Sequence, residues 1–298
     1  MYKNLNALSL GLGGRIHELI ELALSDKFAG FDIDMGALAK QVELQGFEGA
    51  TRFFTGAKIR IGGFELGPDW YGTEEEFQAE LALLERFAPV AKALGADRCL
   101  ANLAPYNDAQ AYQETFGLHV ARIGQIAAVL KPHEIRLGLG FLAPAEHRTG
   151  HASQFIATAE GMIAMLKMVS NDQVGLCLDL WEWTVGGGTL EMLKSLPVSR
   201  VVAVRLADLP EGLDPAEANE SQRLLPGTTD PELSVSVLQW LMDGQYDGPV
   251  TAYAHADQFA GQKRPAVVAR ASASLDQLLS RVTGDELSDA EAEAAAAR

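Results

Sequence analysis

Two carboxylates and two indoles are clustered where a strongly apolar stretch ends. In VGLCLDLWEW, residues 174–183, Asp179 and Glu182 follow a strand-like run, and Trp181 and Trp183 lie beside Glu182. Such carboxylates could bind a divalent ion or move a proton, and the indoles could stack on a sugar face or a flat ring. The alternative is that Glu182 lies on a solvated loop and the tryptophans only pack. Which applies depends on the elements that position them.

Short apolar runs alternate with long amphipathic ones along the chain, which indicates βα units around a parallel sheet. Thr73 followed by Glu76 predicts a capping box at the start of a helix over 73–96, and Asp230 with Pro231 predicts the start of another over 230–245. No GxGxxG or Walker pattern accompanies them. We therefore predict one α/β domain, a single (β/α)8 TIM barrel. Its eight expected strands lie within 6–12, 28–35, 57–66, 98–105, 135–144, 174–183, 200–210 and 248–256.

Active sites of such barrels use the carboxyl ends of the strands and the loops that follow. Arg223 belongs to a loop over 211–230 that is long for a βα connection, so we expect this loop to cover the site. Alternation along the last strand would place Thr251, Tyr253 and His255 on one side. The full set of candidates comprises Trp70, Asn102, Tyr106, Gly140, Asp179, Trp181, Glu182, Trp183, Arg205, Asp208, Arg223, Tyr253 and His255.

Several segments, in their order and spacing, resemble the sugar phosphate isomerase/epimerase family, the xylose-isomerase-like TIM barrels. They are IRLGLGFLAP, VGLCLDLWEW, VVAVRLADLP, LLPG and YDGPVTAYA. The family includes isomerases, epimerases, dehydratases and DNA-repair nucleases, so the resemblance implies the fold more closely than the activity. Its members often form dimers, and a homodimer is the assembly that the resemblance allows.

The resemblance also implies a divalent metal, held by Glu, Asp, His and Glu from strands five to eight. These four positions fall on Gly140, Asp179, Arg205 and Tyr253, so only the aspartate is kept, and Glu182 replaces the histidine that usually follows it. We therefore expect no metal cofactor. A guanidinium stays protonated and would repel a cation, and we hypothesise that Arg205 pairs with Asp179 in the metal's place. The alternative is a different metal set of Asp179, Glu182 and His255.

The family's proton-moving glutamates are its metal ligands, and both are replaced here. The leading hypothesis is a metal-independent isomerase, epimerase or lyase acting on a small polyhydroxy or keto substrate. In it Glu182, Tyr253 or His255 moves the proton, Asp179 orients a hydroxyl and Arg205 stabilises an enolate oxygen. Trp70, Asn102, Tyr106, Trp181, Trp183, Asp208 and Arg223 are the predicted substrate-binding residues. The rival hypothesis is a catalytically silent ligand-binding or subunit protein, which the missing side chain of Gly140 favours.

Other reactive side chains have simpler interpretations. His147 and His151 are four residues apart, but Gly150 and Pro144 predict a loop rather than a helix that would bring them to one face. Cys177 precedes Asp179 by two residues and has no evident histidine partner, so we expect a buried structural thiol.

Charge and composition restrict the partners. The 298 residues include 40 acidic and 24 basic side chains, a formal charge of −16, which disfavours nucleic acid and anionic membranes. No signal peptide or spanning segment is evident, and two cysteines make no disulfide scaffold. We expect a cytoplasmic protein with a small-molecule substrate. The barrel should extend over 1–283, followed by a mobile acidic tail over 284–298.

Overall fold

Eight parallel strands follow one another around a closed barrel in a computed structural model, which describes residues 1–284. Each strand pairs with the next in sequence, and β8 pairs with β1 to close the ring, so the predicted (β/α)8 architecture is confirmed. The strands are β1 (Tyr2–Leu5), β2 (Gly30–Ile33), β3 (Arg60–Glu65), β4 (Arg98–Asn102), β5 (Arg136–Gly140), β6 (Val174–Asp179), β7 (Val201–Leu206) and β8 (Pro249–Ala252).

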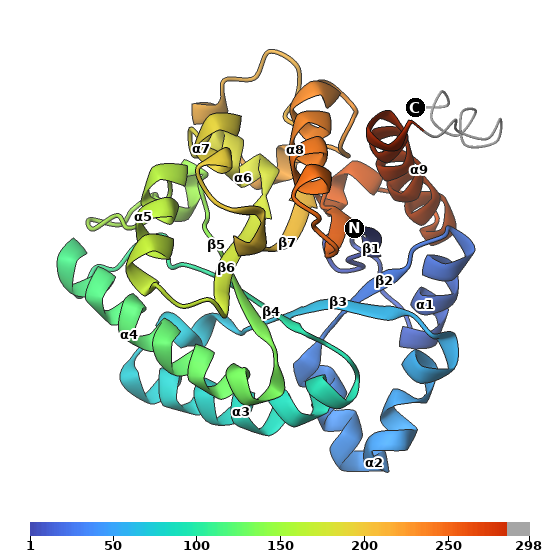
Figure 1. The fold of residues 1–298 in the computed structure, drawn as a ribbon, viewed down its shortest axis with the longest axis horizontal. Coiled ribbons are helices and arrows are strands. Elements are labelled where there is room, and N and C mark those ends of the chain that lie inside the picture. Colours follow the sequence, from blue (N-terminus) through green and yellow to red (C-terminus); the bar gives the residue numbers. More distant parts are fainter. Residues whose placement is uncertain (285–298) are drawn as a thin grey trace.

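Helices surround the strands, as Figure 1 shows, and bury their apolar faces against them. None of the helices in residues 1–284 is both long enough and apolar enough to span a bilayer. The predicted tail lies almost entirely outside the described residues. The helices are α1 (Ile16–Ser25), α2 (Met35–Ala57), α3 (Glu74–Ala93), α4 (Tyr112–Leu130), α5 (Ala159–Val169), α6 (Leu180–Val185), α7 (Leu190–Lys194), α8 (Pro231–Asp243) and α9 (Arg264–Thr283).

Local signals set the helix starts as predicted. Thr73 accepts a hydrogen bond from the N–H of Glu76, whose carboxylate accepts from the N–H of Thr73, which is the predicted capping box. Asp230 caps α8 by accepting from the N–H of Glu232 at 3.0 Å, with Pro231 in the first turn. Both interactions involve residues within three positions of one another, so the sequence alone is enough to predict them.

The first predicted strand is wrong. Residues 6–12 form a turn-containing loop after β1, and Gly11 in it has a φ of +68°, a left-handed conformation that glycine adopts without strain. Leu10 and Leu12 are buried although they lie in this loop. A short apolar run reports burial rather than strand structure, which explains the error.

The sixth strand is shorter than predicted. It ends at Asp179, and the residues that follow begin the short helix α6. The Asp179 side chain caps this helix, accepting from the N–H groups of Trp181 at 3.1 Å and Glu182 at 3.2 Å. Glu182 and both tryptophans are therefore helical, and all three are buried.

Candidate active site at the barrel mouth

A buried ion cluster, Arg223 with Asp179 and Glu182, occupies the carboxyl end of β6. Arg223 donates to the Oδ2 of Asp179 at 2.7 Å and to the Oε1 of Glu182. The exposed fractions of the three side chains are 5% for Arg223, 9% for Asp179 and 3% for Glu182. The other oxygen of Glu182 accepts from the N–H of Ala143 at 2.6 Å. Because Asp179 also caps α6, every carboxylate oxygen of the cluster has a partner.

The loop over 211–230 carries Arg223 to this position and so covers the strand ends, as expected. The guanidinium lies over the Trp181 ring at 4.4 Å and 5.5 Å from the centre of the Tyr253 ring, distances typical of cation–π contacts. Burial opposes the charge on Arg223, but Asp179 and Glu182 raise its pKa above the usual arginine range. Burial raises the pKa of Glu182 to about 7, against the lowering effect of Arg223.

The hypothesis that Arg205 pairs with Asp179 is wrong. Arg205 and Asp179 are register partners on neighbouring strands, but the Arg205 side chain donates to Glu65, at the end of β3. The guanidinium also lies 4.4 Å from the centre of the Tyr253 ring. Asp179 is paired instead with Arg223, which lies in the loop over 211–230. Two buried arginines thus share the carboxyl end of the barrel, with Tyr253 in contact with both.

A second carboxylate system, which sequence reasoning missed, lies on the opposite side of the mouth. Asp32 on β2 accepts from the amide of Asn4 at 2.8 Å and from the amide of Asn6 at 2.9 Å. Asn4 also donates to Thr251 on β8 at 3.0 Å, so this network crosses the barrel closure. Burial raises the pKa of Asp32 to about 6, while Arg205 and the two amides lower it. A carboxyl that titrates near neutrality suits proton transfer.

Asp32 and Glu65 line a cavity of about 390 Å³, here called the mouth cavity. Its other lining residues are Asn6, Ala7, Leu8, Leu12, Ile16, Leu19, Phe31, Ile33, Asp34, Met35, Gly63, Phe64 and Leu100. This volume is within the range of about 300–1,000 Å³ that is usual for small-molecule sites. The position of Asp32 and Glu65 at the ends of their strands was the available sequence signal. The candidates predicted from the sequence lie at the ends of strands four to eight and after strand three, and so do not include Asp32 or Glu65.

The residues at the family's ligand positions do not fit a divalent ion. Asp179 is paired with Arg223, Arg205 is a cation, and Gly140 has no donor side chain. A Cβ on Gly140 would collide with the Oδ1 of Asn102, its register partner, so the Asn102 side chain occupies that space. Across residues 1–284, no three His, Cys, Asp or Glu side chains are grouped as metal ligands would be.

The alternative metal set of Asp179, Glu182 and His255 is not assembled either. The two carboxylates face Arg223, and β8 ends before His255. The predicted alternation stops there, because His255 caps a short 3-10 helix and its Nδ1 accepts from the N–H of Asp257 at 3.3 Å. His255 is nevertheless close to the cluster through its backbone, which donates to the carbonyl of Arg223 at 3.1 Å.

Three of the predicted substrate-binding residues are held by the protein itself. Trp70 donates to the carbonyl of Asn102 at 3.2 Å and Trp183 to that of Thr189 at 3.1 Å, and each indole is 1% exposed. Asp208 is also buried and accepts from the N–H of Thr229 at 2.9 Å, tying β7 to the loop before α8. These contacts are those of packing and loop anchoring.

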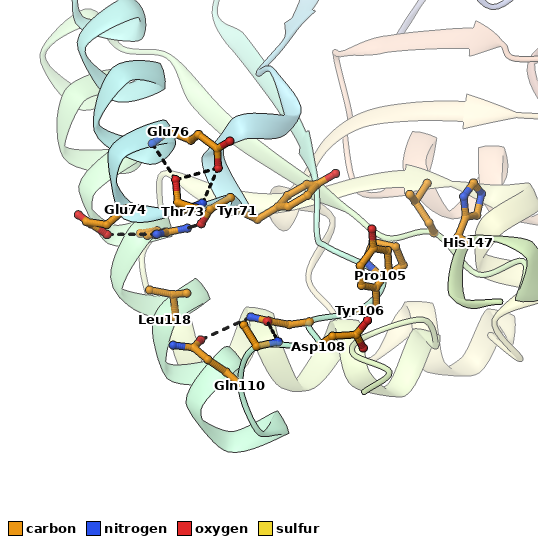
Figure 2. A pocket seen from close by; sticks show the side chains of 15 residues that line it. Tyr71, Thr73, Glu74, Glu76, Pro105, Tyr106, Asp108, Gln110, Leu118 and His147 are labelled. Atoms are coloured by element: carbon orange, nitrogen blue, oxygen red, sulfur yellow. Dashed lines mark hydrogen bonds and ion pairs between the residues drawn. The ribbon is translucent and has the colours of Figure 1, made fainter. Parts of the chain in front are cut away.

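Tyr106 lies apart from the mouth cavity and lines a different groove of about 770 Å³, between the loops after β3, β4 and β5. Figure 2 shows this groove, with Tyr71 between Thr73 on one side and Pro105 and Tyr106 on the other. Tyr106 stacks on His151, with the ring centroids 3.2 Å apart.

The two loop histidines have separate partners. His147 is 3.3 Å from Glu220 and His151 is 2.8 Å from Asp108, so they share no ligand. No helix joins the two histidines, as predicted: His147 lies in a short 3-10 helix over Ala145–Arg148, and residues 149–151 are not helical. Cys177 is buried, and burial raises its pKa to about 12, as expected for a structural thiol.

Comparison with known proteins identifies the family. No curated protein matches this sequence. The structure resembles a xylose isomerase domain protein from Alicyclobacillus acidocaldarius subsp. acidocaldarius, with 24% identity over 95% of this chain and 100% of that one and a TM-score of 0.84. It also resembles the IOLI protein with a bound zinc atom, with 15% identity over 95% and 99% of the chains and a TM-score of 0.80.

A third similar structure is D-psicose 3-epimerase from Clostridium cellulolyticum H10 with D-tagatose, at 14% identity over 95% and 99% of the chains, with a TM-score of 0.73. At these identities the structural likenesses support the fold. The family model for the xylose isomerase-like TIM barrel matches residues 22–278, which is most of the chain. The chain therefore belongs to the xylose isomerase-like TIM barrel family.

Proposed function

We propose that this protein is a metal-independent isomerase, epimerase or lyase that moves a proton on a small keto-bearing substrate bound in the mouth cavity. The observation that carries the proposal is Asp32, a carboxyl at the end of β2 that lines the cavity and is oriented by the amides of Asn4 and Asn6. Family membership, with an epimerase among the similar structures, is consistent with this class of reaction.

In the proposed reaction the Asp32 carboxylate takes a proton from the carbon beside a carbonyl, and the electron pair moves onto the carbonyl oxygen as an enolate. Protonation of the same carbon from the other face by water gives an epimer, and Asp32 gives its proton up to solvent. Where that carbon carries a hydroxyl, protonation of the former carbonyl carbon together with transfer of the hydroxyl proton to the enolate oxygen gives an isomer. Loss of a neighbouring hydroxyl as water gives the lyase product. Because the negative charge passes from Asp32 to the enolate, the net charge of the site does not change. Arg205, which is buried and paired with Glu65, acts electrostatically on Asp32, and the same positive potential favours the enolate.

The remaining candidate groups take supporting roles in this proposal. Asp179 and Glu182 hold Arg223 and have no free oxygen with which to take a proton. Tyr253 contacts both guanidinium groups through its ring. His255 caps the short 3-10 helix over Ala256–Phe259, which follows β8. Among these residues, Arg205 keeps the role expected from the sequence, and Asp32 replaces Glu182 as the proton-moving group.

Deuterium exchange at the carbon beside a carbonyl tests the proposal directly. The wild-type protein should catalyse this exchange in D₂O for at least one member of a panel of inososes, ketohexoses and 2-hydroxycyclohexanone, followed by NMR. Asp32→Asn should lower the rate by roughly 100-fold or more, the usual contribution of a general base. Asp230→Asn is the matched control, because Asp230 caps α8 and does not line the cavity. Exchange that survives Asp32→Asn, or no exchange by the wild type, would refute the proposal.

A catalytically silent ligand-binding protein is the second candidate. The observation that favours it is the saturation of Asp179 and Glu182 by Arg223, the N–H groups of α6 and Ala143. Calorimetric binding of a panel member without any deuterium exchange would support this candidate. Exchange that depends on Asp32 would exclude it.

A further inference from the structure

The residues that line the mouth cavity include no Lys, Arg or His. Its polar side chains are Asn6, Asp32, Asp34 and Glu65. Arg205, the nearest buried cation, already donates to Glu65. A phosphate or carboxylate entering this space would lose its hydration and meet three carboxylates without a cation to pair with. Burying an unpaired charge is costly, so the lining disfavours anions.

The three carboxylates of the cavity differ in what compensates them. Glu65 is paired with the guanidinium of Arg205. Asp32 accepts from the amides of Asn4 and Asn6, and Asp34 accepts from the N–H of Ala37 at 2.8 Å, but these neutral donors cancel no charge. The lining therefore disfavours an anionic ligand and does not disfavour a cationic one.

Apolar side chains from several elements form most of the cavity wall. They come from the loop after β1, helix α1, strands β2 to β4 and the first residue of α2, whereas the four polar side chains lie at or just after the ends of β1, β2 and β3. Leu8 in the loop after β1 is 86% exposed, which places an apolar group where solvent has access. A ligand that fills this space would meet hydrocarbon over most of its surface and polar groups beside Asp32. The apolar lining residues are Ala7, Leu8, Leu12, Ile16, Leu19, Phe31, Ile33, Met35, Phe64 and Leu100.

We infer that the mouth cavity binds a ligand without an anionic group, with an apolar body and a keto or hydroxyl group directed at Asp32. This inference rests on the proposed function, because it takes the cavity as the substrate site. It narrows the substrate from polyhydroxy or keto compounds in general to those with a hydrocarbon face. A ring hydroxylated on every carbon would leave hydroxyl groups against the apolar walls without hydrogen-bond partners, which costs binding energy.

Three six-membered rings separate negative charge from polarity in a calorimetric binding test. They are 2-hydroxycyclohexanone, which is neutral and mostly apolar, 2-hydroxycyclohexane-1-carboxylate, which is anionic, and an inosose, which is neutral and polyhydroxylated. The first should bind at least about tenfold more tightly than each of the other two, a difference of about 1.4 kcal/mol. Equal or tighter binding of either of the other two, or no binding of 2-hydroxycyclohexanone, would overturn the inference.

A substitution at the rim of the mouth cavity tests whether the rings bind there. Leu8→Arg would place a cation at the mouth and should strengthen binding of the carboxylate ring by roughly threefold or more. Leu44→Arg is the matched control, since Leu44 is 80% exposed on α2 and does not line the cavity. An unchanged affinity in Leu8→Arg, or the same gain in Leu44→Arg, would show that the rings bind elsewhere and would overturn the assignment.

The binding test of the ligand class and the exchange test of the proposed function can fail independently of each other. If 2-hydroxycyclohexanone binds preferentially but exchanges no deuterium, the proposed function fails and the inferred ligand class stands. If Asp32-dependent exchange occurs only with anionic or fully hydroxylated ketones, the proposed function stands and the inferred class fails.

Discussion

Replacing Arg223 by Met should destabilise the protein by about 3–5 kcal/mol, the usual cost of removing one partner from a buried ion pair. The size follows from the geometry of the cluster. Arg223 is the common partner of Asp179 and Glu182, and all three side chains are less than a tenth exposed. Met keeps the packing against Trp181 but leaves two carboxylates facing each other without a cation.

Urea unfolding monitored by circular dichroism at about pH 7.5 measures the loss. Arg281→Met is the matched control: Arg281 pairs with Glu232, but the two side chains are 38% and 69% exposed, so less than about 1 kcal/mol should be lost. Adding Glu182→Gln to Arg223→Met should recover part of the deficit by removing one of the stranded charges. A protein that does not fold with Arg223→Met alone can still be measured with the double substitution.

The loss of unfolding free energy in Arg223→Met should also depend on pH. Without Arg223, Glu182 loses the interaction that opposes its burial, so its folded pKa should rise above about 7, well above its unfolded value. The cost of the buried carboxylate then applies fully above the folded pKa and disappears as the pH falls toward the unfolded pKa. The deficit should therefore be smaller at about pH 5 than at pH 8. A loss below about 1 kcal/mol, or one independent of pH, would refute the buried cluster.

Three further predictions concern other parts of the barrel. The exchange rate should rise with pH through an apparent pKa near 6, because the Asp32 carboxylate is the form that takes the proton, and a flat profile would contradict its role. Gly140→Ala should cost about 1–3 kcal/mol in urea unfolding, since the new Cβ meets Asn102, and Asn102→Ala in the same chain should recover part of it. Burial lowers the pKa of His119 to about 4, so below pH 6.5 the unfolded chain binds a proton that the folded one does not. Stability should fall by roughly 3 kcal/mol from this group between about pH 7 and pH 4, and His119→Gln should lack that part of the decrease.

Local patterns in the sequence were sufficient for the architecture. Apolar runs alternating with amphipathic ones predicted eight βα units, and the caps at Thr73 and Asp230 marked helix starts correctly. The same kind of pattern misplaced the first strand, because Leu10 and Leu12 are buried in a loop rather than in the sheet. Apolar composition reports that a segment is buried, and several backbone conformations can satisfy it.

The candidate site depended on contacts that no local pattern contains. The sequence placed Asp179 and Arg205 at neighbouring strand ends, which the register confirms, yet it did not reveal that Arg205 turns to Glu65 and that Arg223 reaches Asp179 from a loop. A long arginine side chain can reach several carboxylates at the mouth of the closed barrel. Those carboxylates are distant from the arginine in the sequence, so no local pattern shows which of them it will pair with.

Asp32 shows most clearly which features the sequence predicts and which depend on tertiary contacts. Its residue type and its place near a strand end were evident from the sequence, but its environment was not. Only closure of the barrel brings Asn4 on β1 and Thr251 on β8 together. Only the conformation of the loop after β1 brings Asn6 to the second carboxylate oxygen of Asp32. The sequence by itself therefore determined which groups stand at the barrel mouth. The tertiary structure decided which are paired and which can titrate, because pairing and desolvation depend on neighbours that the fold supplies.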